Sequence, residues 1–193
     1  MQETTKFPLL SGNLSVDLVN TEVVRRGQRQ DLLPLEKDIW DWLYTVQTHI
    51  PFWHEKMPEF KEQLPTIKEK LLDMRTVLRE QFDAIADQHT VTDTFISYLE
   101  SFIERAPITY KLRDEQLIPR PVGKLEDMIM TIIALDALTL IAQHKLQLLK
   151  RCANTDCVLL FIDEGGRRKW CSMKICGNRK KVAKFQHRKT EDM

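Results

Sequence analysis

Residues 152–176 of this 193-residue chain read CANTDCVLLFIDEGGRRKWCSMKIC, and they contain all of its cysteines. Four residues separate Cys152 from Cys157, four more separate Cys171 from Cys176, and thirteen residues lie between the pairs. Four thiolates suit tetrahedral coordination of Zn²⁺ and complete it without a further ligand. Because disulfides rarely persist in a reducing cytoplasm, we expect a structural zinc site here; four free buried cysteines are the alternative.

The residues around the cysteine pairs predict how this module folds. Residues 158–162 have the composition of a β-strand, residues 164–166 can turn, and residues 167–170 would return toward the second cysteine pair as a hairpin. Ser172 is a candidate helix cap, which would place Cys176 at the start of a helix. A knuckle, a hairpin and a ligand-bearing helix predict a treble-clef-like zinc finger over residues 150–193.

The preceding residues, 1–149, predict a mostly helical domain. Apolar residues recur every three or four positions in stretches that begin near residues 35, 65 and 93, and residues 123–149 are apolar on nearly every face. The alternation of Leu14, Val16 and Leu18 instead predicts a bent strand or hairpin over 14–33, and a second hairpin is expected over 109–121. The fold class is therefore mainly α with short β-hairpins.

Charge is divided unevenly between these two parts. Residues 150–193 hold twelve Lys and Arg against five Asp and Glu, a net charge of +7, whereas residues 1–149 have a net charge of −6. Residues 165–190 carry ten basic residues and no acid, which is typical of a surface that binds a polyanion, although a solvated charged face is the alternative. The candidate nucleic-acid-binding residues are Arg167, Arg168, Lys169, Asn178, Arg179, Lys180, Lys181, Lys184, His187, Arg188 and Lys189.

Two stretches resemble a known family. The sequence WCSM at 170–173 followed by CGNR at 176–179, together with the preceding cysteine pair, resembles the bacterial CGNR zinc-finger family. The sequence VDLVNT at 16–21 and the following DLL at 31–33 are similar to the ABATE domain that precedes this finger in the family. Members are described as stress-induced transcription regulators, so the resemblance implies DNA binding.

The helical domain carries one further candidate site. Asp17, Asn20, Thr21 and Arg25 form a dense polar group in an apolar segment and could line a pocket for a small-molecule effector. The alternative is that Asn20 and Thr21 satisfy backbone groups at a bend. A homodimer would suit a palindromic operator.

Other classes of function remain as alternatives or are disfavoured. An RNA- or ribosome-associated protein, or a finger used only for protein interaction, would fit the same composition. An enzyme is not expected, because the chain lacks a phosphate-binding loop, a nucleophile elbow and a HExxH motif. A cytoplasmic protein is expected, because residues 1–10 lack the apolar core of a signal peptide. No membrane span is expected, because the longest apolar stretch, 128–142, is shorter than the ~20 residues that cross a bilayer.

Overall fold

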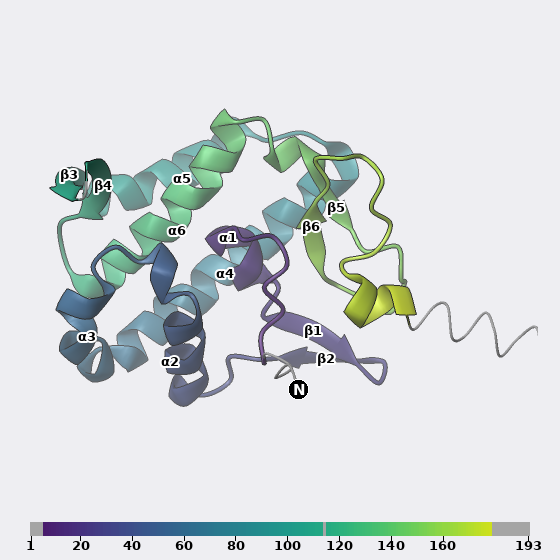
Figure 1. The fold of residues 1–193 in the computed structure, drawn as a ribbon, viewed down its shortest axis with the longest axis horizontal. Helices are drawn as coiled ribbons and strands as arrows, with labels where there is room; N and C mark the ends of the chain where they lie inside the picture. The colour runs from purple at the N-terminus through teal and green to yellow at the C-terminus, as the bar shows by residue number, and fades with distance from the viewer. Residues whose placement is uncertain (1–5, 114, 179–193) are drawn as a thin grey trace, which may run out of the picture.

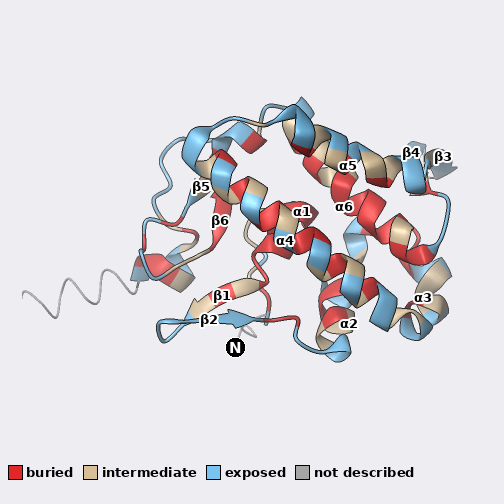
Figure 2. Cartoon of the chain, turned by 180° about the vertical axis from the view of Figure 1, so that it is seen from behind, coloured by how far each residue is buried: buried red, intermediate tan, exposed pale blue. Residues whose placement is uncertain are grey.

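Helices dominate the structure, a computed structural model that describes residues 6–113 and 115–178. The long helix α4 (Leu64–Gln88) runs beneath the others, and α5 (Asp93–Arg105) and α6 (Leu125–Ala142) pack side by side (Figure 1). Helix α6 also contacts α4 and the short helix α1 (Leu14–Val19), so most of its residues are buried (Figure 2). The expected central helix is thus confirmed, although it ends at residue 142, before the 3-10 turn Leu146–Leu148.

The first element corrects an expectation from the sequence. Residues Leu14–Val19 form a helix instead of a strand, with backbone hydrogen bonds from Asp17 to Asn13 and from Asn20 to Val16. The alternation of apolar residues suggested one buried face, but every residue of α1 is buried, because α4, α6 and the finger surround it. A helix suits this enclosed position because it satisfies its backbone groups within the segment.

A β-hairpin follows α1, as the sequence predicted for the rest of this segment. Strand β1 (Glu22–Arg25) pairs antiparallel with β2 (Gln28–Asp31), and every residue of β2 is exposed. Arg26 and Gly27 form the turn with φ of 53° and 77°. Two successive positive φ angles are typical of the tight turns whose twist matches that of the paired strands.

Two helices and a turn cover one end of the bundle. Helix α2 (Glu36–Thr45) begins where expected and ends before the 3-10 turn Gln47–His49. Helix α3 (Trp53–Glu62) was not predicted, because Pro58 lies inside it and interrupts the sequence signal. Its buried Trp53 and Phe60 nevertheless anchor it to the core.

The predicted cap of α5 and the second predicted hairpin are confirmed. Thr92 caps α5 by accepting a hydrogen bond from the amide of Phe95. Strands β3 (Ile108–Arg113) and β4 (Gln116–Pro121) form the second expected hairpin, at the end of the molecule opposite the cysteines (Figure 1).

The described part of the C-terminal module contains two strands and a short helix. Strand β5 (Leu149–Arg151) pairs antiparallel with β6 (Leu160–Ile162), and Met173–Gly177 form the π-helix η3. The predicted hairpin between 158–162 and 167–170 is therefore wrong: β6 pairs with the strand that precedes the first cysteine pair. Leu149 and Leu160, at opposite ends of this pairing, are fully buried, which favours it over a pairing with the exposed, basic residues 167–169.

One hydrophobic core joins the module to the helices. Leu149, Leu160 and Phe161 of the module belong to the same buried cluster as residues of α1, α4 and α6. Strand β5 also crosses the predicted domain boundary between residues 149 and 150. The division of the chain into two domains at this position stays a prediction. No helix within the described ranges is long and apolar enough to cross a membrane.

Candidate metal centre and its junction with the helices

The four cysteines converge although they come from two separate loops. Cys152 and Cys157 lie in the connection between β5 and β6, Cys171 precedes η3, and Cys176 lies within it. Their sulfur atoms all lie within 4.8 Å of one another, and Cys152, Cys171 and Cys176 are buried. The predicted ligand set is therefore assembled in the fold as a candidate metal centre.

The spacing of the sulfur atoms fits a tetrahedral metal ion. Zn–S bonds of about 2.3 Å in a regular tetrahedron place sulfur atoms about 3.8 Å apart, and the Sγ atoms of Cys157 and Cys171 are 3.9 Å apart. Two donors also point at sulfur atoms: the Cys171 amide at Cys152, 3.4 Å away, and the Asn154 side-chain amide at Cys176, 3.5 Å away. Such contacts stabilise thiolates, which are the metal-binding form of cysteine.

The cysteine thiols of the cluster differ in their pKa values. A hydrogen bond from Cys171, with those from the Leu159 amide and the other thiols, lowers the pKa of Cys157 to about 6 despite its burial. Burial and the nearby Cys157 charge raise the pKa of Cys176 to about 11, and sharing its proton with Cys157 raises the pKa of Cys171. The charge of one thiolate opposes ionisation of its neighbours, and a bound divalent cation would stabilise the thiolate form of all four.

Local sequence around the second cysteine pair explains the geometry there. The Ser172 hydroxyl accepts a hydrogen bond from the Ile175 amide, as predicted for a helix cap. A Cβ atom on Gly177 would lie 2.5 Å from the sulfur of Met173 and 3.4 Å from the Trp170 ring. Glycine at this position therefore lets η3 close tightly beneath Met173.

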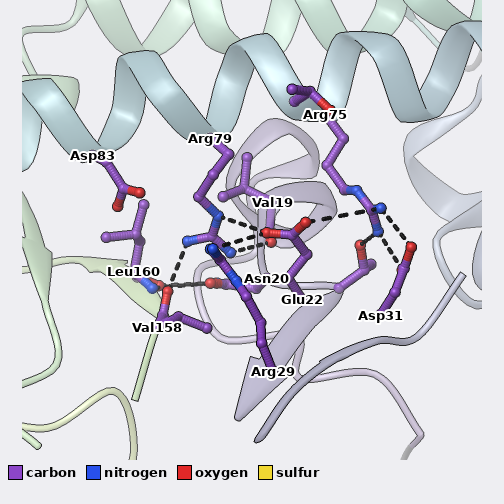
Figure 3. Close-up of polar contacts among 12 residues, drawn as sticks. Val19, Asn20, Glu22, Arg29, Asp31, Arg75, Arg79, Asp83, Val158 and Leu160 are labelled. Atoms are coloured by element: carbon purple, nitrogen blue, oxygen red, sulfur yellow. Dashed lines mark hydrogen bonds and ion pairs between the residues drawn. The ribbon is translucent and has the colours of Figure 1, made fainter. Parts of the chain in front are cut away.

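The first contact between module and helices uses Asn20, at the C-terminal end of α1. Its side-chain amide donates to the carbonyl oxygen of Leu160, and its side-chain oxygen accepts from the Leu160 amide, both at 2.9 Å (Figure 3). Leu160 is the first residue of β6, three residues after Cys157. Asn20 thus pairs with β6 as a neighbouring strand would.

Arg79 of α4 makes the second contact and is 6% exposed. Its Nη1 donates to the carbonyl of Val158, next to the ligand Cys157, at 2.7 Å, and its Nη2 donates to the carbonyl of Val19 at 2.6 Å. Its Nε is 3.2 Å from a carboxylate oxygen of Glu22 in β1 (Figure 3). Burial lowers the pKa of Arg79, and the neighbouring charges of Asp83 and Glu22 oppose that shift.

Arg75, one turn earlier on α4, extends this network. Its guanidinium binds both carboxylate oxygens of Asp31 in β2, at 2.6 and 2.7 Å, and donates to the Thr21 hydroxyl at 2.9 Å. We call Glu22, Asp31, Arg75 and Arg79 the arginine cluster. It fixes both strands of the β1–β2 hairpin to α4, and through Arg79 it joins them to the finger.

A third contact lies on the surface. Arg151 of β5 donates to the carboxylates of Asp83 and Asp87 on α4, at 2.6 and 2.8 Å. Its hydrogen bond to Asp87 raises the pKa of Arg151 and lowers that of the carboxylate. Because both acids are partly exposed, this pair contributes less to stability than the buried arginine cluster.

The predicted nucleic-acid residues divide into four groups. Arg167 and Lys169 are exposed, and neither side chain forms a hydrogen bond or ion pair with another described residue. Arg168 lies over the Phe161 ring, 4.3 Å from its centre, and donates to the Cys171 carbonyl. Asn178 is exposed and its amide caps η3. The other candidates lie outside the described residues: Arg179, Lys180, Lys181, Lys184, His187, Arg188 and Lys189.

Three of the four predicted pocket residues have backbone partners. The Asp17 carboxylate accepts from the amides of Leu10 and Ser11, and the Thr21 hydroxyl donates to the Leu18 carbonyl. Arg25 is exposed at the end of β1, so the structure does not bring it together with the others around one opening. A cavity of about 190 Å³ lies elsewhere, lined by Leu14, His49, Pro51, Pro119, Ile132, Leu135, Asp136 and Thr139.

Sequence reasoning missed Arg75 and Arg79, although a signal was present. Both fall on the apolar face of α4, beside the buried Leu71, Leu78 and Phe82 in the 3.6-residue repeat. A charged side chain is rarely buried unless it is paired. Two arginines on an apolar stripe therefore predict acidic or carbonyl partners from elsewhere in the chain.

The fold and the site together define a helical protein with a four-cysteine zinc finger packed against it. The CGNR zinc finger family matches residues 149–189, and the ABATE family, whose description is "Putative stress-induced transcription regulator", matches residues 12–144. The chain belongs to the ABATE family and carries a CGNR zinc finger at its C-terminal end, which confirms the resemblance found in the sequence. No curated protein matches the chain.

Proposed function

We propose that this chain is a zinc-dependent, DNA-binding regulator of transcription. The observation that carries the proposal is the cluster of four cysteine sulfur atoms, all within 4.8 Å of one another, at the start of a segment rich in Lys and Arg. The ABATE description supports the regulatory role, since it names a transcription regulator. The protein would act in the cytoplasm, where reducing conditions keep the thiols available.

Zinc is the ion that suits this donor set. Four thiolates at tetrahedral spacing favour Zn²⁺ over harder cations, which prefer oxygen ligands. With all four positions taken by protein, the ion would hold the finger together instead of activating water. This supports a structural role, and we propose no catalytic activity for the chain.

The charge of the finger supports a nucleic-acid partner. Residues 165–190 carry ten basic residues and no acid, and Arg167 and Lys169 are exposed. Each phosphate neutralised by such residues releases condensed counterions, so the logarithm of affinity should fall with the logarithm of salt by about 0.9 per contact. The helical domain would position the finger and is the proposed site of effector sensing or dimerisation.

The decisive experiment recovers genomic DNA bound to the zinc-loaded wild type and to Arg179→Ala. We expect a defined set of sequences for the wild type and weaker or altered recovery for the variant. A titration with matched duplex DNA and structured RNA then tests the partner. Tighter binding to RNA, or no salt-dependent binding to either, would contradict the proposed function and favour an RNA-associated or protein-docking role.

A further inference from the structure

The β1–β2 hairpin is a strongly basic projection from an otherwise acidic domain. Residues 23–30 carry three arginines and no acid, and all residues from Arg25 to Gln30 are exposed. Within the described part of the chain, the side chains of Arg25 and Arg26 form no hydrogen bond or ion pair. Among the described residues Arg29 forms an ion pair with Glu22 alone, at 3.2 Å, and its side chain stays 56% exposed.

The acids of the hairpin are confined to its base. Glu22 and Asp31 face each other in the register of the two strands, and both are bound by the arginines of α4. Arg75 and Arg79 compensate most of their negative charge, and neither acid pairs with Arg25 or Arg26 at the tip. The charge of the whole domain, −6, conceals this local excess of positive charge.

The same cluster places the hairpin beside the finger. Arg79 joins Glu22, at the base of β1, to the Val158 carbonyl next to a cysteine ligand. Asn20, two residues before β1, is bound to Leu160 of β6. Figures 1 and 2 show the hairpin and η3 projecting from the same end of the molecule, with the turn between β1 and β2 pointing outward. Buried contacts hold this arrangement in place.

We propose that the tip of the β1–β2 hairpin is a second DNA-binding element, which contacts the duplex beside the finger. The inference rests on the proposed function, and it assigns part of the interface to the helical domain. Arg25 and Arg26 neutralise phosphates or donate to guanine, and the exposed amides of Gln28 and Gln30 have the donor and acceptor pair that recognises adenine. A two-stranded ribbon also fits the major groove of B-form DNA, which is about 12 Å wide.

The test compares two pairs of charge-removing substitutions in the full, zinc-loaded chain. Arg25→Gln/Arg26→Gln removes two charges from the hairpin tip. Lys111→Gln/Lys124→Gln removes two exposed charges near the opposite hairpin, β3–β4. Binding to a duplex selected from a random pool by the wild type is measured across a range of salt concentrations. Because both variants change the net charge equally, a difference in DNA affinity between them reports a local contact of the hairpin tip with DNA.

We expect the tip variant to bind at least about tenfold more weakly and to lose about two units of salt slope, one for each lost phosphate contact. The control variant keeps the wild-type slope. Hydroxyl-radical footprints of the tip variant should lose one block of protected sugars and retain the block protected by the finger. Arg25→Lys/Arg26→Lys should restore the slope, because lysine keeps the charge.

The outcomes separate this inference from the proposed function. If the wild type binds DNA but the tip variant matches the control in affinity, slope and footprint, the hairpin is not a DNA contact and the function stands. If the lysine variant fails to restore the slope, the electrostatic contact is likewise excluded. If the zinc-loaded wild type binds no DNA, both fail. Unchanged thermal unfolding of the variants, expected for exposed and unpaired side chains, confirms that they are folded.

Discussion

Asn20 and Leu160 are joined by two hydrogen bonds of 2.9 Å across 140 residues of sequence. The side-chain amide of one residue thereby satisfies both backbone groups of the other, at a buried position. The finger is consequently docked on the helical domain by a specific polar contact as well as by apolar packing. The movements of the two parts should therefore be coupled.

The first prediction concerns this contact. Asn20→Ala leaves the amide and the carbonyl of Leu160 buried without partners, which should lower the free energy of unfolding by about 2 to 4 kcal/mol. Equilibrium unfolding in urea measures the change. Asn13→Ala is the matched control, because the Asn13 side chain does not cap α1 and is only partly buried. Equal losses for the two variants would contradict the role given to Asn20.

The second prediction concerns the arginine cluster. Arg79→Met leaves the carbonyls of Val19 and Val158 without their donor and removes one of the cations that bind Glu22, so the free energy of unfolding should fall by about 3 to 5 kcal/mol. Arg79→Lys should also destabilise the protein, since one ammonium cannot reach three separate acceptors.

Arg105→Met is the control for this series. Arg105 is exposed and hydrogen-bonds only to Ser101 of its own helix, so its loss should cost about 1 kcal/mol or less. Urea unfolding of the three variants gives the comparison. A smaller loss for Arg79→Met than for Arg105→Met would show that the buried network does not stabilise the fold.

The third prediction concerns removal of the metal. Structural zinc contributes about 10 to 16 kcal/mol to the folding of isolated zinc-finger peptides, so chelation should unfold the finger. Because β5 and β6 pack on α4 and α1, hydrogen exchange should accelerate in residues 149–178 and also in α1. Helix α5, which packs mainly on α6, should keep its protection. Cys176→Ser should reproduce the pattern without a chelator, and uniform loss of protection would contradict it.

The fourth prediction concerns the dependence of stability on pH, to which Asp17 and Asp31 should contribute with opposite signs. Burial raises the pKa of Asp17 above its ordinary 3.8, although hydrogen bonds from Leu10 and Ser11 oppose the shift. The folded state therefore binds this proton more tightly than the unfolded state, and the charge of Asp17 destabilises the fold as pH rises through its folded pKa. Asp17→Asn should gain stability relative to the wild type above that pKa, and the gain should vanish below pH 3.8.

Asp31 behaves in the reverse way. Burial opposes its ionisation, but hydrogen bonds from Arg75 and the Leu33 amide outweigh burial and lower its pKa below 3.8. Its contribution is complete above 3.8 and is lost as pH falls through the folded pKa. Asp31→Asn should therefore cost stability at neutral pH and little at the acid end. Unfolding measured at each pH against the wild type tests both variants, and differences of the same sign would contradict the assignment.

Much of the fold could be predicted because its signals are local. The repeat of apolar residues along α4, α5 and α6, the cap at Thr92 and the hairpin turn at Gly27 depend on neighbours in sequence. Helix α1 was missed because six residues are too few to distinguish alternation from a helix that is buried on all sides. Pairing of β6 was also missed, because its partner precedes the cysteines that seemed to delimit the module.

The sequence by itself determined the chemistry of the metal centre. Cysteine spacing and residue type are sufficient there, because four cysteines in two closely spaced pairs typically bind zinc. Only the tertiary structure decided the roles of Asn20, Glu22 and Arg79. Their partners lie 57 or more residues away, and whether a polar side chain reaches solvent, a ligand or a buried carbonyl depends on what the whole chain packs around it.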